Sequence, residues 1–156
     1  MSIKLLTLCL VHQDSKILLG MKKRGFGVGK WNGFGGKVIE GESIEDAAKR
    51  ETNEECGIIL DKIEKLGIVE FEFINNLGEI MQVHIFKATE FSGEVIESEE
   101  MNPRWFNIDE IPFDSMWSDD PYWMPLFLSD KKFKGKFLYD NKDQVLEKFI
   151  EVVDQI

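Results

Sequence analysis

The sequence is poor in cysteine, in positive charge and in long apolar runs, and each shortage excludes a class of protein. Only Cys9 and Cys56 are present, too few for a disulfide framework, which suits a reducing compartment. The apolar stretch that starts at Ile3 reaches His12 and Asp14 too soon to span a membrane, and it lacks a small-residue cleavage site. We therefore expect a cytoplasmic protein.

Acidic residues outnumber basic ones, with 29 Asp and Glu against 19 Lys and Arg, a net charge of −10 and an isoelectric point near 4.7. Such a surface repels nucleic-acid polymers and anionic membranes, which disfavours DNA or RNA binding. A free nucleotide can still bind, because its phosphates arrive with metal.

The chain length and the absence of repeats, low-complexity stretches and linkers predict a single domain over residues 1–156. Apolar and alternating runs predict mostly strands. The expected strands are 3–11, 16–21, 66–74, 81–89, 105–107 and 133–139, with a helix at about 44–56 and a helical turn or two from Pro121. Residues 145–152 fit either a strand paired with 133–139 or a helix.

The segment from Gly36 to Ile58 has the signals of a helix with defined ends. Ser43 can cap its N-terminus, with Asp46 in the position that reaches back to the cap. Gly57 suits the left-handed residue that ends a helix.

Three glutamates share one face of this expected helix. At 3.6 residues per turn, Glu51, Glu54 and Glu55 lie together, and apolar residues fall on the same face one to two turns earlier. Carboxylates packed so closely repel each other unless a cation lies among them. Oxygen-only ligands favour Mg²⁺ or Mn²⁺ over zinc. The alternative is a solvated acidic face, but the glycine loop before the helix and Arg50 favour a metal site.

Residues 25–37, GFGVGKWNGFGGK, contain six glycines but neither the order G-x-G-x-x-G nor the ending G-K-[ST]. A dinucleotide-binding or P-loop motif is therefore disfavoured. We expect these glycines to let the backbone approach phosphate and metal closely.

The segment from Gly36 to Ile58 matches the signature of the Nudix hydrolase superfamily, and the chain is identified as a member by that resemblance. The matching positions are Gly36, Glu42, Arg50, Glu51, Glu54, Glu55, Gly57 and Ile58. Thr52 stands where a bulky aliphatic residue is expected, which reduces apolar packing but removes no chemical group. The resemblance implies an α+β Nudix fold, with a mixed β-sheet core sandwiched between α-helices.

Flanking segments narrow the resemblance to the animal MutT-like oxidised purine nucleoside triphosphatases. They are KKRGFGVGKWNGFGGK, VHIF, ESEEMNPRWF and MWSDDPYW, and the similarity covers most of residues 3–139. It implies Mg²⁺-dependent hydrolysis of substrates such as 8-oxo-dGTP and 2-hydroxy-dATP to a monophosphate and pyrophosphate. Such an enzyme sanitises the nucleotide pool of the cytoplasm, mitochondria or nucleus.

The resemblance also assigns roles to residues. Arg50 would hold the carboxylates through Glu42 or Glu51, and either Glu55 or Glu100 would be the general base. The implied metal ligands are the carbonyl of Gly35 and the carboxylates of Glu51, Glu54, Glu55 and Glu100. The implied substrate-binding residues are Thr7, Lys22, Phe26, Asn32, Phe34, Gly35, Gly36, Lys37, Trp117, Ser118, Asp119 and Asp120.

Within that set, Lys22 would meet the triphosphate, Trp117 would stack on the base, and Asn32, Asp119 and Asp120 would bind its edge. Two neighbouring carboxylates in an apolar pocket disfavour double ionisation, so one is expected to hold a proton near neutral pH. Asp120 is a candidate for the charged acceptor. His84, alone in a strand pattern, is taken as structural.

Two alternatives stay open. One is a different Nudix specificity, such as a dinucleoside polyphosphate, a sugar nucleotide or capped RNA; the acidic surface disfavours the last and the paired aspartates disfavour the others. The second is a non-catalytic domain that binds nucleotide as a sensor, which the intact Glu51, Glu54 and Glu55 disfavour. We expect a monomer that binds neither a nucleic-acid polymer nor a membrane.

Overall fold

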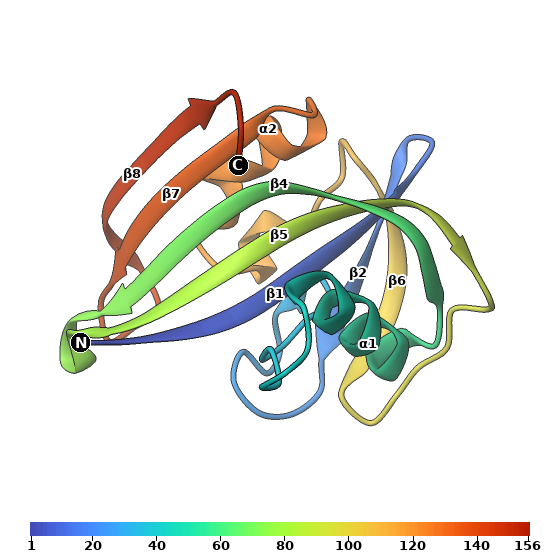
Figure 1. Ribbon diagram of the computed structural model, residues 1–156, viewed down its shortest axis with the longest axis horizontal. Helices are drawn as coiled ribbons and strands as arrows, with labels where there is room; N and C mark the ends of the chain where they lie inside the picture. The colour runs from blue at the N-terminus through green and yellow to red at the C-terminus, as the bar shows by residue number, and fades with distance from the viewer.

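The computed structural model describes all residues, 1–156. A single mixed sheet of eight strands runs through the molecule, with one helix on each face (Figure 1). The strands are β1 (Ser2–Gln13), β2 (Lys16–Lys22), β3 (Trp31–Asn32), β4 (Ile59–Phe73), β5 (Glu79–Ser92), β6 (Met101–Asn107), β7 (Lys132–Tyr139) and β8 (Val145–Val153). The helices are α1 (Ile44–Cys56) and α2 (Asp120–Leu128), and two 3₁₀ turns are η1 (Ile74–Asn76) and η2 (Phe113–Ser115). This arrangement confirms the expected fold class.

The strand order is β3-β2-β1-β5-β4-β7-β8, and β6 pairs with β2. The β1–β5 and β4–β7 pairs are parallel, whereas the other pairs are antiparallel. The parallel pairs place segments that are far apart in the sequence side by side at the centre of the sheet.

Helix α1 has the ends that its sequence predicts. The N–H of Asp46 donates to Ser43 Oγ at 3.1 Å, which caps the first turn. At the other end Gly57 has φ 82°, and its N–H donates to the carbonyl of Asn53 at 2.9 Å. Ala47 and Ala48, on the inner face, are fully buried. The helix is therefore fixed in register against the sheet, which sets where its glutamates lie.

Neighbouring residues of β1 belong to two separate cores. Cys9 in β1 packs in the core on the α1 face with Ala48, whereas the next residue, Leu10, packs on the α2 face with Trp123 and Phe127. Figure 1 shows α1 lying across one face of the sheet and α2 behind the other.

Three elements differ from the sequence-based expectation. Strand β4 begins at Ile59, not near 66, because three register shifts against β5 interrupt the alternation in its first half. Strand β6 begins at Met101, not 105; it contains Pro103, which an edge strand tolerates. The two-residue strand β3 lies inside the glycine-rich loop and was not expected.

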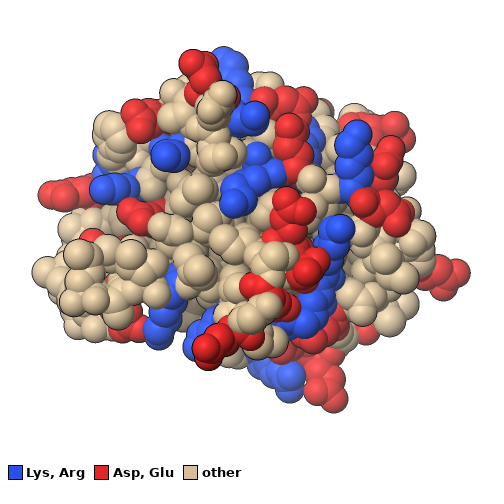
Figure 2. Space-filling view, viewed as in Figure 1, with Lys and Arg blue, Asp and Glu red and all other residues tan.

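The C-terminal ambiguity is also settled. Residues Val145–Val153 form a strand that pairs antiparallel with β7, so the helix alternative was wrong. No helix is long and apolar enough to cross a membrane. On the face that carries α1, acidic side chains are dense around α1 and the loop that precedes β6 (Figure 2).

Candidate active site

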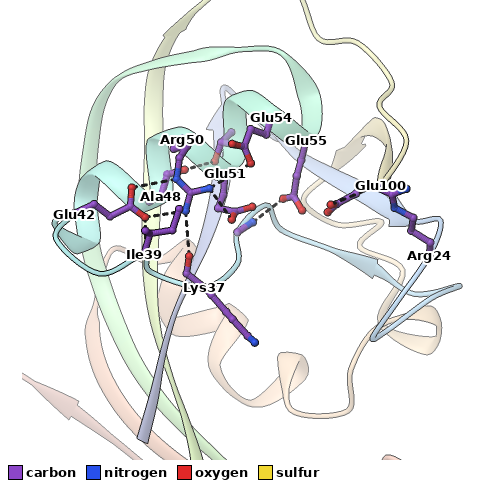
Figure 3. Close-up of polar contacts among 12 residues, drawn as sticks. Arg24, Lys37, Ile39, Glu42, Ala48, Arg50, Glu51, Glu54, Glu55 and Glu100 are labelled. Atoms are coloured by element: carbon purple, nitrogen blue, oxygen red, sulfur yellow. Dashed lines mark hydrogen bonds and ion pairs between the residues drawn. The ribbon is translucent and has the colours of Figure 1, made fainter.

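Helix α1 presents Glu51, Glu54 and Glu55 at different depths (Figure 3). Glu55 is only 2% exposed, the side chain of Glu51 is 16% exposed and that of Glu54 is 57% exposed. The carboxylate of Glu55 accepts a hydrogen bond of 2.8 Å from the backbone N–H of Gly35. One helical face therefore carries a graded series of carboxylates from the core to the solvent.

Burial has a direct effect on the ionisation of these groups. It raises the pKa of Glu55 to about 8, although the Gly35 N–H and Lys22 oppose the rise; the charges of Glu51 and Glu100 add to it. Burial likewise raises the pKa of Glu51, against the influence of Arg50. The carboxylates thus sense each other and favour any cation placed among them.

Arg50 connects the carboxylates to the loop in front of the helix. Its guanidinium donates to Glu42 at 2.8 Å, to Glu51 at 3.0 Å and to Glu54 at 3.3 Å, and also to the carbonyl of Lys37 at 3.1 Å. Both expected contacts, to Glu42 and to Glu51, are formed. Arg50 therefore orients the acidic face as a fixed fork.

Two glycines allow the glycine-rich loop to lie close to β1 and to helix α1. A Cβ on Gly35 would lie 1.8 Å from the backbone oxygen of Thr7, and one on Gly36 would lie 2.8 Å from the carboxylate of Glu51. Any larger residue would push the loop away from β1 or from the glutamates.

Glu100 reaches the same region from the loop that precedes β6, and Figure 3 shows it facing Glu55. Its carboxylate lies 3.6 Å from Lys22 Nζ and 3.7 Å from Arg24. Lys23 secures the loop, since its Nζ donates to Glu97 at 2.5 Å and to the carbonyl of Ser98 at 2.8 Å. The three consecutive basic residues therefore hold the loop that carries Glu100.

An aromatic cluster lies at the other end of the glycine-rich loop. Phe26 stacks on Trp117 with ring centroids 5.0 Å apart, and Phe73 and Tyr139 meet Trp117 edge-on at 6.5 and 5.7 Å. Phe26 is 66% exposed, and the glycines on both sides of it have positive φ. A cleft of about 280 Å³ opens beside Phe26 and Phe73. A base can stack on this face of Trp117 only after Phe26 moves.

Asp119 and Asp120 lie beside this cluster and are each 3% exposed. Both oxygens of Asp119 accept hydrogen bonds, Oδ1 from the Tyr139 hydroxyl and Oδ2 from Trp123 Nε1 at 2.8 Å. Asp120 Oδ2 has no partner. Burial raises the pKa of both groups, and for Asp120 burial together with the charge of Asp119 raises the pKa well above its usual range. The structure thus makes Asp119, not Asp120, the better charged acceptor.

Comparison with known proteins agrees with this geometry. Residues 5–127 match the model of the NUDIX domain family. The chain belongs to the Nudix family. It is 54% identical to the oxidized purine nucleoside triphosphate hydrolase of Danio rerio, over 98% of this chain and 97% of the relative. The mouse protein of the same name is also 54% identical, over 97% and 96% of the two chains.

A solved structure also resembles this chain in fold and sequence. A MutT protein from Bacillus halodurans superposes with a TM-score of 0.86 at 31% identity, covering 95% of this chain and 97% of that protein. Nudix hydrolases generally use divalent metal ions.

The Nudix glutamates supply suitable donors for such an ion, since they are carboxylate oxygens whose mutual repulsion a cation would relieve. In this structure no three of them are gathered as a complete ligand set. Their oxygens instead meet Arg50, the Gly35 N–H and Lys22. The residues therefore fit an oxygen-liganded divalent cation, and the ligands must turn from these partners to bind it.

Several expected substrate residues of this Nudix domain lie elsewhere. Thr7 belongs to the row of β1 residues that includes Cys9, so its side chain is on the α1 face, opposite the aromatic cluster. Phe34 is fully buried in the α1-side core, where it pairs with Cys9. The side chain of Lys37 points away from the carboxylates (Figure 3). The backbone of Thr7 donates to the carbonyl of Gly36, and the carbonyl of Lys37 accepts from Arg50, while the substrate-binding roles of Thr7, Phe34 and Lys37 stay predictions.

Ser118 and Asn32 are occupied by local contacts. Ser118 Oγ donates to the carbonyl of Asp143 and accepts from the N–H of Val145, so it fastens the β7–β8 turn. Asn32 Oδ1 accepts from the N–H of Gly33, which leaves its amide group free for a ligand.

Sequence reasoning did not single out Tyr139, Trp123 or Phe73. Each is an aromatic residue in a strand or a helix, and such residues usually form core. The only signal was the density of aromatic residues around Asp119 and Asp120, which does not say which ring carries the hydrogen bond.

Proposed function

We propose that this Nudix domain, residues 1–156, hydrolyses oxidised purine nucleoside triphosphates such as 8-oxo-dGTP and 2-hydroxy-dATP to a monophosphate and pyrophosphate. The two relatives at 54% identity support this assignment, because their shared name states this activity and the similarity spans nearly both chains. The reaction would act on the free nucleotide pool of the cytoplasm, with Mg²⁺, or Mn²⁺ in its place, and with a monomeric enzyme.

The observation that carries the proposal is that one loop touches both halves of the site. Phe26, at its start, stacks on Trp117, and Gly35, near its end, donates to Glu55. A nucleotide whose base lies by Trp117 can therefore extend its phosphates along the loop toward the carboxylates.

The acidic end would bind the metal through Glu51, Glu54, Glu55, Glu100 and the carbonyl of Gly35. When bound, Mg²⁺ neutralises charge on the phosphates and increases the acidity of water. Either Glu55 or Glu100 would be the general base, because their carboxylates face each other at the acidic end of the site. Arg50 positions these carboxylates without touching substrate.

The aromatic end would bind the base. Trp117 and Phe26 supply the stacking surfaces, and Asn32, Asp119 and Asp120 supply hydrogen bonds to its edge. Lys22 would exchange its contact with Glu100 for one with the triphosphate. The triphosphate is an anion like Glu100, and the Lys22–Glu100 ion pair is only partly buried. The close approach of Gly35 to β1 and of Gly36 to Glu51 would leave the backbone of both glycines beside the phosphates.

A pyrophosphate-release assay over a panel of nucleotides tests the proposal. The panel contains 8-oxo-dGTP, 2-hydroxy-dATP, dGTP, dATP, a dinucleoside polyphosphate, a sugar nucleotide and capped RNA, each with and without Mg²⁺. We expect both oxidised purine triphosphates to have specificity constants about tenfold or more above those of dGTP and dATP.

The panel also separates the alternatives. Preference for a dinucleoside polyphosphate, a sugar nucleotide or capped RNA would replace the proposal with another Nudix specificity. Tight binding of 8-oxo-dGTP with no turnover in the presence of Mg²⁺ or Mn²⁺ would identify a sensor.

A further inference from the structure

The Tyr139 side chain connects the end of β7 to the aspartate pair. Its ring is 1% exposed and stacks on Phe73 with centroids 5.3 Å apart. Its hydroxyl donates to Asp119 Oδ1 and accepts from the backbone N–H of Asp119 at 3.1 Å. The phenol therefore fixes both the backbone and the carboxylate of one residue.

This contact determines what Asp119 can still do. Trp123 Nε1 donates to the other oxygen, so each oxygen of Asp119 faces a donor from the protein. An ionised carboxylate with two donors is favoured over a protonated one, because its proton would have to displace one of them. Burial and the neighbouring charge raise the pKa of Tyr139, which keeps the hydroxyl protonated as a donor.

Asp120 has the opposite surroundings. It is equally buried, but its Oδ2 has no hydrogen-bond partner. Two adjacent buried carboxylates do not both ionise readily. Asp119, which accepts hydrogen bonds from two donors, therefore keeps the charge, and Asp120 keeps a proton. A protonated Asp120 offers one donor and one acceptor to a ligand.

We propose that the Tyr139 hydroxyl is a specificity-determining group: by holding Asp119 as an ionised acceptor, it leaves Asp120 as the carboxyl that donates a proton to the base edge in a hydrogen bond. Tyr139 acts through Asp119 and is a positioning residue. The inference rests on the proposed function. It names the side chain that sets the preference between two purines whose hydrogen-bonding edges carry different donors and acceptors.

The variant Tyr139→Phe removes one oxygen and keeps the ring. We expect the ratio of kcat/KM for 8-oxo-dGTP to that for 2-hydroxy-dATP to change by roughly fivefold or more, mainly through KM. Tyr122→Phe is the matched control, because Tyr122 is 42% exposed and its hydroxyl makes no contact with the pair; its ratio should stay at the wild-type value. Equal losses on both substrates for Tyr139→Phe, or no change, would overturn the inference.

An infrared spectrum tests the same point without turnover. The spectrum is taken in the Glu55→Gln background, because Glu55, with its pKa of about 8, would add a second band. This protein should show the carbonyl stretch of a protonated carboxyl near neutral pH. Asp120→Asn should remove this band, and Tyr139→Phe should shift or weaken it. A band that Asp119→Asn removes and Asp120→Asn leaves would refute the assignment.

A second substitution tests the inference if Tyr139→Phe does not fold. In the Tyr122→Phe protein, biosynthetic 3-fluorotyrosine replaces Tyr139 alone, and its more acidic hydroxyl is a stronger donor. The carboxyl band and the substrate ratio should then move in the direction opposite to Tyr139→Phe; no movement of either contradicts the inference. Failure of the wild-type protein to hydrolyse either substrate would instead refute the proposed function, and the infrared result would still stand.

Discussion

The buried carboxylate of Glu55 accepts a 2.8 Å hydrogen bond from the backbone N–H of Gly35, across twenty residues of sequence. This single contact fastens the glycine-rich loop to the acidic face of α1. It also gives Glu55 a polar partner that does not neutralise its charge. The side chain is therefore held in place while its affinity for a proton stays high.

Substitution of this carboxylate by an amide tests its role. We expect Glu55→Gln to fold normally, because the amide oxygen can still accept from Gly35, and to lose roughly a hundredfold or more in kcat at saturating Mg²⁺. Glu45→Gln, on the exposed first turn of α1, is the control and should keep the wild-type rate. A folded Glu55→Gln protein with a near wild-type rate would remove Glu55 from the mechanism.

The raised pKa of Glu55 predicts how stability depends on pH without metal. The unfolded value is 4.5 and the folded value is about 8, so the native state binds the proton more tightly and stability falls as pH rises between these values. Urea unfolding in EDTA should show wild type losing about 2 kcal/mol more than Glu55→Gln between pH 6 and pH 8. Equal slopes for the two proteins would contradict the shift.

Arg50 is expected to act through the carboxylates that it holds. Arg50→Lys loses the fork that reaches Glu42, Glu51 and Glu54, so we expect kcat to fall by about tenfold or more with little change in KM. Glu42→Gln should have a milder effect than Glu55→Gln, because Glu42 only orients Arg50. A rise in KM alone for Arg50→Lys would indicate that the guanidinium contacts substrate.

Lys23 should affect the metal rather than the chemical step. Lys23→Met removes the contacts to Glu97 and to the carbonyl of Ser98 that hold the Glu100 loop. The Mg²⁺ concentration for half-maximal activity should rise by about threefold, while kcat at saturating Mg²⁺ and the thermal midpoint change little, because exposed ion pairs contribute little to stability. Lys16→Met, at the exposed start of β2, is the control. An unchanged Mg²⁺ requirement would show that the loop does not need this support.

Asp119→Asn tests the hydrogen bonds that fix the aspartate pair. Asparagine has one acceptor oxygen and one amide group, so it cannot accept from both Trp123 and Tyr139. We expect a loss of about 1–2 kcal/mol in unfolding free energy and a change of about tenfold in the ratio of the two specificity constants. Chemical denaturation and steady-state kinetics on both substrates measure these effects. Unchanged stability would mean that the two donors are not essential to the fold.

The sequence predicted α1 well because its determinants are local. A cap at Ser43, a left-handed Gly57 and three glutamates at helical spacing all lie within one short segment. The start of β4 was missed because its exposed charged residues and register shifts hide the two-residue period.

Contacts between distant segments could not be predicted from local pattern. Phe26 on Trp117 and Tyr139 on Asp119 depend on how β7 pairs with β4 and where the glycine-rich loop folds back. The role of Thr7 in substrate binding stays a prediction: its side chain is buried, and its Oγ1 has no hydrogen-bond partner.

The strand order has a consequence for the sequence of events during synthesis. The acidic end of the site is complete once Glu100 has left the ribosome, but Tyr139 belongs to β7, whose partner β4 was made more than sixty residues earlier. Domains fold as units, and distant pairings close slowly. A nascent chain will therefore carry these carboxylates exposed to solvent for a time before the base pocket exists.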